Sequence, residues 1–181
     1  MKKSLIAAIL FASATFGSSA VLAQDVIGNS PQALSLVDNS AYFGDTFEAD
    51  NEGNTFADRF TFTVDGDVGV NLDAIVASIS GSADEGLDIT GLALYGEDET
   101  LITTGSSLMG GAMDVWSVSS DNLVAGNYYL QVSGTLVSDT GASFGGAVML
   151  APVPEPETYG MMLGGLGVLG FLARRRKDRQ A

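Results

Sequence analysis

The chain has 181 residues, enough for a single domain with flanking segments, and it contains no His and no Cys. These absences exclude imidazole bases, thiol nucleophiles, His-ligated zinc and disulfides, so carboxylates, hydroxyls and oxygen-ligated hard cations remain. Arg59 is the only basic side chain from residue 24 to 173, and this span has 21 Asp and Glu and a net charge of −20. Binding to nucleic acids or to anionic membrane surfaces needs Lys and Arg, so the charge of this span excludes both kinds of partner.

The N-terminus has the three parts of a secretory signal peptide. Lys2 and Lys3 precede the apolar stretch Leu5–Phe16, and small residues follow up to Ala23. This pattern predicts a signal peptide over 1–23, with entry through the Sec translocon and removal by signal peptidase after Ala23. The alternative, a retained N-terminal membrane helix, fits less well because the apolar stretch is short.

Residues 24–152 are predicted to form one acidic β-sandwich. In Phe56–Val64 the apolar side chains Phe60, Phe62 and Val64 alternate with polar ones, as in a half-buried strand. Similar short strands separated by Gly, Asn, Asp and Ser, without a long helical period, predict a single all-β domain, an antiparallel and jelly-roll-like sandwich. The further predicted strands are Val68–Leu72, Ala74–Ser80, Leu87–Tyr95, Leu101–Thr104, Asp114–Ser119, Tyr128–Ser133 and Phe144–Leu150. In Leu87–Tyr95 the apolar phase switches at Gly91, which predicts a β-bulge there.

Asp58 is the most informative polar residue of this domain, because it shares the inward phase with Phe56 and Phe60. A buried carboxylate needs donors, so we expect Asp58 to accept backbone N–H bonds from a neighbouring loop. An alternative hypothesis makes Asp58 a Ca²⁺ ligand together with the loop acids Asp84, Glu85 and Asp88. Arg59 faces outward and is expected to pair with a nearby acid.

Two acidic clusters, Asp45–Gly53 and Glu97–Glu99, are interpreted as solvated loops, because neither has the ligand spacing of an EF-hand. A glycosidase needs one defined pair of carboxylates, and no pair is singled out among the 21 acids. Trp116 and Tyr129 are predicted to be core and sheet-face residues rather than a sugar-stacking platform.

The C-terminal region has three parts: the rigid segment 153–159 with Pro154, Glu155 and Pro156, an apolar helix over 160–173, and a basic cluster over 174–179 that includes Arg174, Arg175, Arg176 and Lys177. The apolar run from residue 159 to 173 has 15 residues, about 22 Å of helix against a hydrocarbon thickness of roughly 30 Å. The basic residues that follow predict a transmembrane helix whose C-terminal end is cytoplasmic.

This tail resembles the PEP-CTERM sorting signal of exopolysaccharide-producing Gram-negative bacteria. The resemblance implies export, temporary anchoring in the inner membrane and cleavage near Pro154-Glu155-Pro156 by an exosortase. Phe56-Ala57-Asp58-Arg59-Phe60 and the stretch 123–134 also resemble the FxDxF family of PEP-CTERM proteins, in which we expect Phe56, Asp58 and Phe60 to be structural. The same strands are similar to small jelly-roll domains appended to secreted bacterial peptidases, which are accessory or binding modules without catalysis.

These observations predict an exported, non-enzymatic protein of the cell surface or extracellular matrix that is associated with exopolysaccharide and biofilm. No cofactor is expected, apart from Ca²⁺ in the alternative hypothesis. That alternative is a calcium-dependent carbohydrate-binding module, and a carboxylate glycosidase is a distant third.

Overall fold

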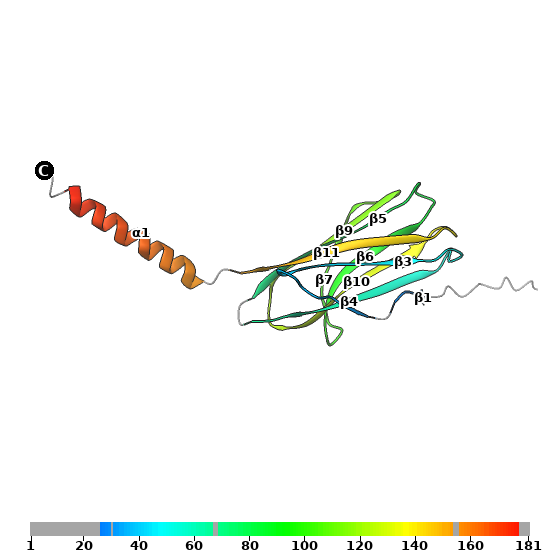
Figure 1. Cartoon of the computed structure of the whole chain (residues 1–181), viewed down its shortest axis with the longest axis horizontal. Helices are drawn as coiled ribbons and strands as arrows, with labels where there is room; N and C mark the ends of the chain where they lie inside the picture. Colours follow the sequence, from blue (N-terminus) through cyan, green and yellow to red (C-terminus); the bar gives the residue numbers. More distant parts are fainter. Residues whose placement is uncertain (1–25, 30, 67–68, 154–155, 178–181) are drawn as a thin grey trace, which may run out of the picture.

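The computed structural model describes residues 26–29, 31–66, 69–153 and 156–177. The predicted signal peptide, 1–23, lies outside the described residues. Strands in two facing layers make up most of the described chain, and one helix follows them near the C-terminus (Figure 1). The predicted all-β sandwich is therefore confirmed.

Two sheets form the sandwich. Sheet A has the order β1 (Val26–Ile27), β4 (Thr55–Val64), β10 (Gly126–Leu136), β6 (Leu87–Gly96) and β7 (Leu101–Thr104), and β2 (Gln32–Ala33) also pairs with β4. Sheet B has the order β3 (Ser40–Phe47), β11 (Ala142–Pro152), β5 (Val70–Ile79), β9 (Met113–Leu123) and β8 (Ser106–Met109).

The antiparallel pairs are nested along the chain. The innermost pair is β6 with β7, and β5 with β9, β4 with β10 and β3 with β11 enclose it in turn. This is a long hairpin that has been rolled up, the connectivity of a jelly roll. Because the outermost pair joins distant parts of the sequence, β3 lies beside β11, the last strand of the domain.

The core lies between the two sheets and is rich in aromatic rings. The ring of Phe60 on β4 packs against Phe43 of β3 with centroids 4.9 Å apart, and Phe56 packs against Phe47 at 4.7 Å. Phe144 of β11 stacks on Phe56 at 5.4 Å. The period-two pattern of β4 puts Phe56 and Phe60 on one face, so their burial against the rings from β3 and β11 fixes which face of sheet A meets sheet B.

Most of the predicted strands are present, and the differences have physical reasons. The segments predicted separately as 68–72 and 74–80 form the single strand β5, because Val70, Leu72, Ala74 and Val76 keep one inward phase through an exposed Asp73. The predicted bulge is confirmed, since Ser133 pairs with Gly91 while Gly134 pairs with Ile89. The pattern missed β1, β2, β3 and β8.

The predicted C-terminal helix is present and is longer than expected. Helix α1 spans Pro156–Lys177. No helix within the described ranges is long and apolar enough to cross a membrane, so the predicted transmembrane helix over 160–173 is not supported. The apolar run is short, and five of its 15 residues are glycines, which lower its mean hydropathy.

Candidate functional sites

Asp58 lies in the core of the sandwich, directly under the first described residues. Its side chain is only 2% exposed, and the backbone N–H of Asn29 donates to Oδ1 at 2.9 Å. The neighbouring Gly28 has φ +135°, and a Cβ at that position would collide with the same oxygen. The expectation that Asp58 holds a neighbouring loop through a backbone N–H is thus confirmed, and the loop can approach so closely because residue 28 is glycine.

Asp45 is the acidic residue that faces Asp58 across the core. It lies on β3 between Phe43 and Phe47, whose rings pack on the two aromatic neighbours of Asp58 in the inward phase. The sequence interpretation of Asp45 as a loop acid was wrong, because Asp45 is a half-buried residue of β3. It lies near Asp58 because β3 pairs with β11, a contact that local sequence does not reveal.

The Asp45–Asp58 pair is short of donors. Oδ2 of Asp58 is buried and finds no hydrogen-bond donor among the described residues. Burial raises the pKa of Asp58 to about 7, the N–H of Asn29 opposes this rise, and the charge and hydrogen bond of Asp45 add to it. The raised pKa of Asp58 favours the neutral form of this carboxyl below about pH 7.

The acids once considered as co-ligands of Asp58 lie elsewhere. Burial, followed by the charges of Asp114 and Asp84, raises the pKa of Asp88, so this residue belongs to a different acidic neighbourhood. Across the described ranges, no group of three or more acidic side chains is arranged to hold a metal ion. The set of Asp58 with Asp84, Glu85 and Asp88 is thus not assembled by the fold.

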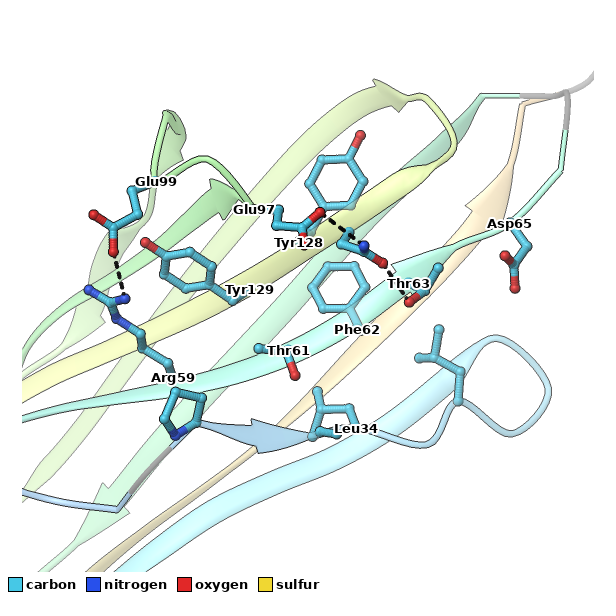
Figure 2. A pocket seen from close by; sticks show the side chains of 14 residues that line it. Leu34, Arg59, Thr61, Phe62, Thr63, Asp65, Glu97, Glu99, Tyr128 and Tyr129 are labelled. Carbon is cyan, nitrogen blue, oxygen red and sulfur yellow. Dashed lines mark hydrogen bonds and ion pairs between the residues drawn. The ribbon is translucent and has the colours of Figure 1, made fainter.

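A polar groove lies on the outer face of sheet A, and Arg59 lies toward one end of its lining (Figure 2). Nη1 of Arg59 donates to Oε1 of Glu99 at 3.0 Å, and its guanidinium lies 4.9 Å from the ring centre of Tyr129. Tyr129 also stacks on Tyr95, with centroids 5.0 Å apart and planes 7° from parallel. The prediction that Arg59 faces outward and pairs with an acid is confirmed.

Tyr129 is a sheet-face residue, as predicted, and it is not an open platform. Arg59 and Tyr95 leave it only 6% exposed. Burial raises the pKa of its hydroxyl, and the positive charge of Arg59 partly offsets this effect. Trp116 is partly buried and packs against the core, again as predicted. Neither ring is therefore free to stack on a sugar.

The remaining lining of the groove offers several hydrogen-bonding groups. Thr63 donates to Asn127 at 2.9 Å, and Asn127 donates to Glu97 at 3.0 Å, so these three side chains form a chain across the strands (Figure 2). Leu34 and Leu36 belong to the opposite, apolar part of the lining, and the space enclosed is about 630 Å³. Hydroxyl, amide, carboxylate and guanidinium groups thus meet an apolar wall, a combination that suits a polyhydroxylated ligand.

The C-terminal motif follows the sandwich without a linker. Strand β11 ends at Pro152, and the N–H of Val153 still donates to the carbonyl of Gly69 at 2.9 Å. Pro154 and Glu155 lie outside the described residues, and Pro156 begins α1. The basic residues Arg174, Arg175, Arg176 and Lys177 form the last turn of that helix.

The chain is thus a β-sandwich domain joined directly to a C-terminal sorting segment, and comparison with known proteins identifies that segment. Residues 152–177 match the PEP-CTERM protein-sorting motif. The chain therefore carries a PEP-CTERM sorting motif, and this motif implies export, a membrane-associated precursor and processing by an exosortase.

The other comparisons concern the sandwich. No curated protein matches the chain significantly. Among solved structures, the chain is similar to the pre-peptidase C-terminal domain of a collagenase from Bacillus anthracis, with 15% identity, coverage of 68% of this chain and 99% of that domain, and a TM-score of 0.40.

Proposed function

We propose that this protein is a non-catalytic component of the cell surface or extracellular matrix, and that the acidic sandwich is what the sorting tail delivers. The observation that supports this proposal is the sorting motif that follows strand β11 directly. Cleavage near Pro154-Glu155-Pro156 releases the whole sandwich, because the core cluster lies entirely on strands that precede the motif. The signal peptide 1–23 is removed during export, and the C-terminal sorting segment keeps the precursor associated with the inner membrane until the exosortase acts.

The proposal that the protein is not an enzyme is supported by the burial of its best candidate for an acid–base residue. The Asp45–Asp58 pair is the best candidate for acid–base chemistry, but Asp58 is only 2% exposed and its neighbours are core rings. A glycosidase must place its two carboxyls on either side of a substrate. We assign Phe56, Asp58 and Phe60 a structural role, and the resemblance of residues 56–60 to the FxDxF motif is the basis for proposing that the chain belongs to that family.

Processing of the tail is tested in a host that has an active exosortase. Mass spectrometry of the mature protein should detect no peptide from Arg174–Arg179, and replacement of Pro154-Glu155-Pro156 by Ala should leave full-length protein in the inner membrane. Pro31→Ala, a proline change within the sandwich, is the control and should be processed like the wild type. A mature wild-type protein that keeps its basic cluster would contradict the proposal.

A second candidate function is binding of carbohydrate, and the groove around Arg59 favours it. We propose an exopolysaccharide as the ligand class, because the lining combines hydrogen-bonding groups with an apolar wall. Affinity electrophoresis against neutral and acidic polysaccharides, with Ca²⁺ or with EDTA, tests this role and its calcium dependence. Asn127→Ala should weaken retention, while Asp139→Ala, outside the groove, should not. Equal migration of both variants and the wild type would rule out the groove.

A further inference from the structure

Large apolar side chains lie exposed on the outer face of sheet B, as they also do on helix α1. Tyr42 of β3 is 88% exposed, and Ile75 of β5 and Met149 of β11 are 46% and 60% exposed. The strand register puts Tyr42, Ala147, Ile75 and Ser117 in one row across four strands. The exposed apolar side chains on the strands of this sheet are Tyr42, Ile75, Ile79, Leu108, Met109, Met113 and Met149. Contiguous exposed apolar surface of this kind marks an interaction site.

This face carries few charged side chains. Among the acids on β3, β5, β9 and β11, Asp114 is buried and Asp45 is half-buried, while Asp73 and Asp121 are exposed. Asp73 is the one acidic residue in the lining of the hollow at the centre of the face. Residues 24–152 carry one Arg and 19 Asp and Glu, a net charge of −18, and most of these acids lie on loops and on the other surfaces.

The hollow has a shape that a large side chain can fill. It encloses about 440 Å³ and is lined by Tyr42, Ile75, Ala147 and Met149, among other residues. Ala147 lies between Tyr42 and Ile75 in the row, so a small residue forms the floor between two larger ones. The protruding Tyr42 ring and the neighbouring depression belong to the same surface, as a two-fold symmetric contact requires.

We propose that the outer face of sheet B binds the same face of a second copy of this chain. The five strands contain 44 residues, and at ~3.3 Å per residue and ~4.8 Å between strands they give a face of roughly 700 Å² per copy, close to the ~800 Å² per partner of a specific complex. Two aligned sheets then pack with Tyr42 of each copy in the hollow of the other.

The distribution of charge favours a second copy of the chain over an anionic polysaccharide as the partner of this face. Two copies of such an acidic domain repel each other through every acidic surface, and a face-to-face contact through sheet B buries little charge while keeping the acidic loops apart. An anionic polysaccharide would gain no ion pair on this face, because none of its strands carries a basic residue. The apolar area and the self-complementary shape therefore point to a second copy.

The absence of cysteine allows a direct test on the full chain. Single cysteines are introduced at Ile75, at the centre of the face, and at the exposed Thr63, on the outer face of sheet A. Each variant is purified in detergent and treated with a bis-maleimide whose reach matches the ~10 Å separation of packed sheets. Ile75→Cys should give a cross-linked dimer and Thr63→Cys should not. Both variants carry the same α1, so association through the helix would affect them equally.

A second change shows whether the contact uses Tyr42. In the Ile75→Cys background, Tyr42→Glu should abolish the cross-linked dimer, while Val124→Glu, at an exposed turn outside sheet B, should leave it intact. Equal cross-linking at Ile75 and Thr63, no cross-linking at either, or a dimer that survives Tyr42→Glu overturns the proposal. Protection of the Ile75→Cys thiol from a monofunctional maleimide by added polysaccharide, and not by added protein, overturns it in favour of a glycan.

Discussion

Asp58 should make the stability of the sandwich depend on pH in a direction opposite to that of an ordinary salt-bridged carboxylate. Its pKa is raised from 3.8 to about 7 in the folded protein, chiefly by burial. Between these values the folded state holds a proton that the unfolded state releases. The contribution of Asp58 to the free energy of unfolding is therefore full below pH 3.8 and falls as the pH rises towards about 7.

The size of the effect follows from the two pKa values. One pKa unit corresponds to about 1.4 kcal/mol, so the ionised Asp58 costs the folded state at most roughly 4 kcal/mol above pH 7. Asp58→Asn keeps an oxygen that can accept from the N–H of Asn29, and its amide can donate to Asp45. The variant should therefore be more stable than the wild type at about pH 8 and nearly equal to it at about pH 4.

The assay is urea denaturation of the sandwich, residues 24–153, at several pH values between about 4 and 8. Asp65→Asn, which removes an exposed acid, is the matched control and should show no pH-dependent difference from the wild type. The comparison with this control separates the burial of Asp58 from the general relief of charge repulsion. Asp45→Asn should reduce the pH dependence in part, because it removes the facing charge.

Equal destabilisation of the domain by Asp58→Asn at both ends of the pH range would contradict the predicted pH dependence. That result would mean that Asp58 is ionised throughout and is stabilised by donors beyond the N–H of Asn29.

The other predictions concern the core and cations. Phe60→Ala, at a position with 0% exposure, should cost roughly 3–5 kcal/mol in urea denaturation, while Thr61→Ala on the opposite face should cost far less; equal costs would mean that the strand phase is wrong. Salt should raise the melting temperature by screening the acidic surface over ~10 Å at 0.1 M, and NaCl at matched ionic strength should act nearly as well as CaCl₂. We expect CaCl₂ to raise the melting temperature slightly more than NaCl through diffuse binding, and this small difference should persist in Asp58→Asn. A saturable rise in melting temperature with Ca²⁺ that disappears in Asp58→Asn would instead show that Asp58 is a ligand.

The sequence pattern predicted the features of the fold that are determined by residues close together in the chain. The phase of β4 follows from Phe60, Phe62 and Val64 alone, and the bulge beside Gly91 follows from a switch of apolar phase within one strand. The sorting motif could be read from the sequence because its three parts are contiguous. In each case the determining residues lie within a short stretch of chain.

The sites missed by sequence reasoning depend on contacts between distant strands. Asp45 occupies an inward position of β3, but the acids that follow it suggested a loop, and only the pairing of β3 with β11 brings it to Asp58. Arg59 was predicted to face outward, yet its partner Glu99 could not be named because 40 residues separate them. Strand β8 has four exposed residues and therefore shows no alternation to detect.

The position of β11 determines how the sandwich responds to mechanical force. This last strand lies between β3 and β5 within sheet B, and the sorting tail continues from its end. Tension applied through the tail acts along the length of β11, so it loads both ladders of hydrogen bonds in shear, including the Val153–Gly69 bond at the point of attachment. A strand at a sheet edge, or one pulled perpendicular to its ladder, would instead unzip one bond at a time. The domain is therefore attached to its tail through an interior strand that is well placed to carry a load while the precursor is associated with the membrane.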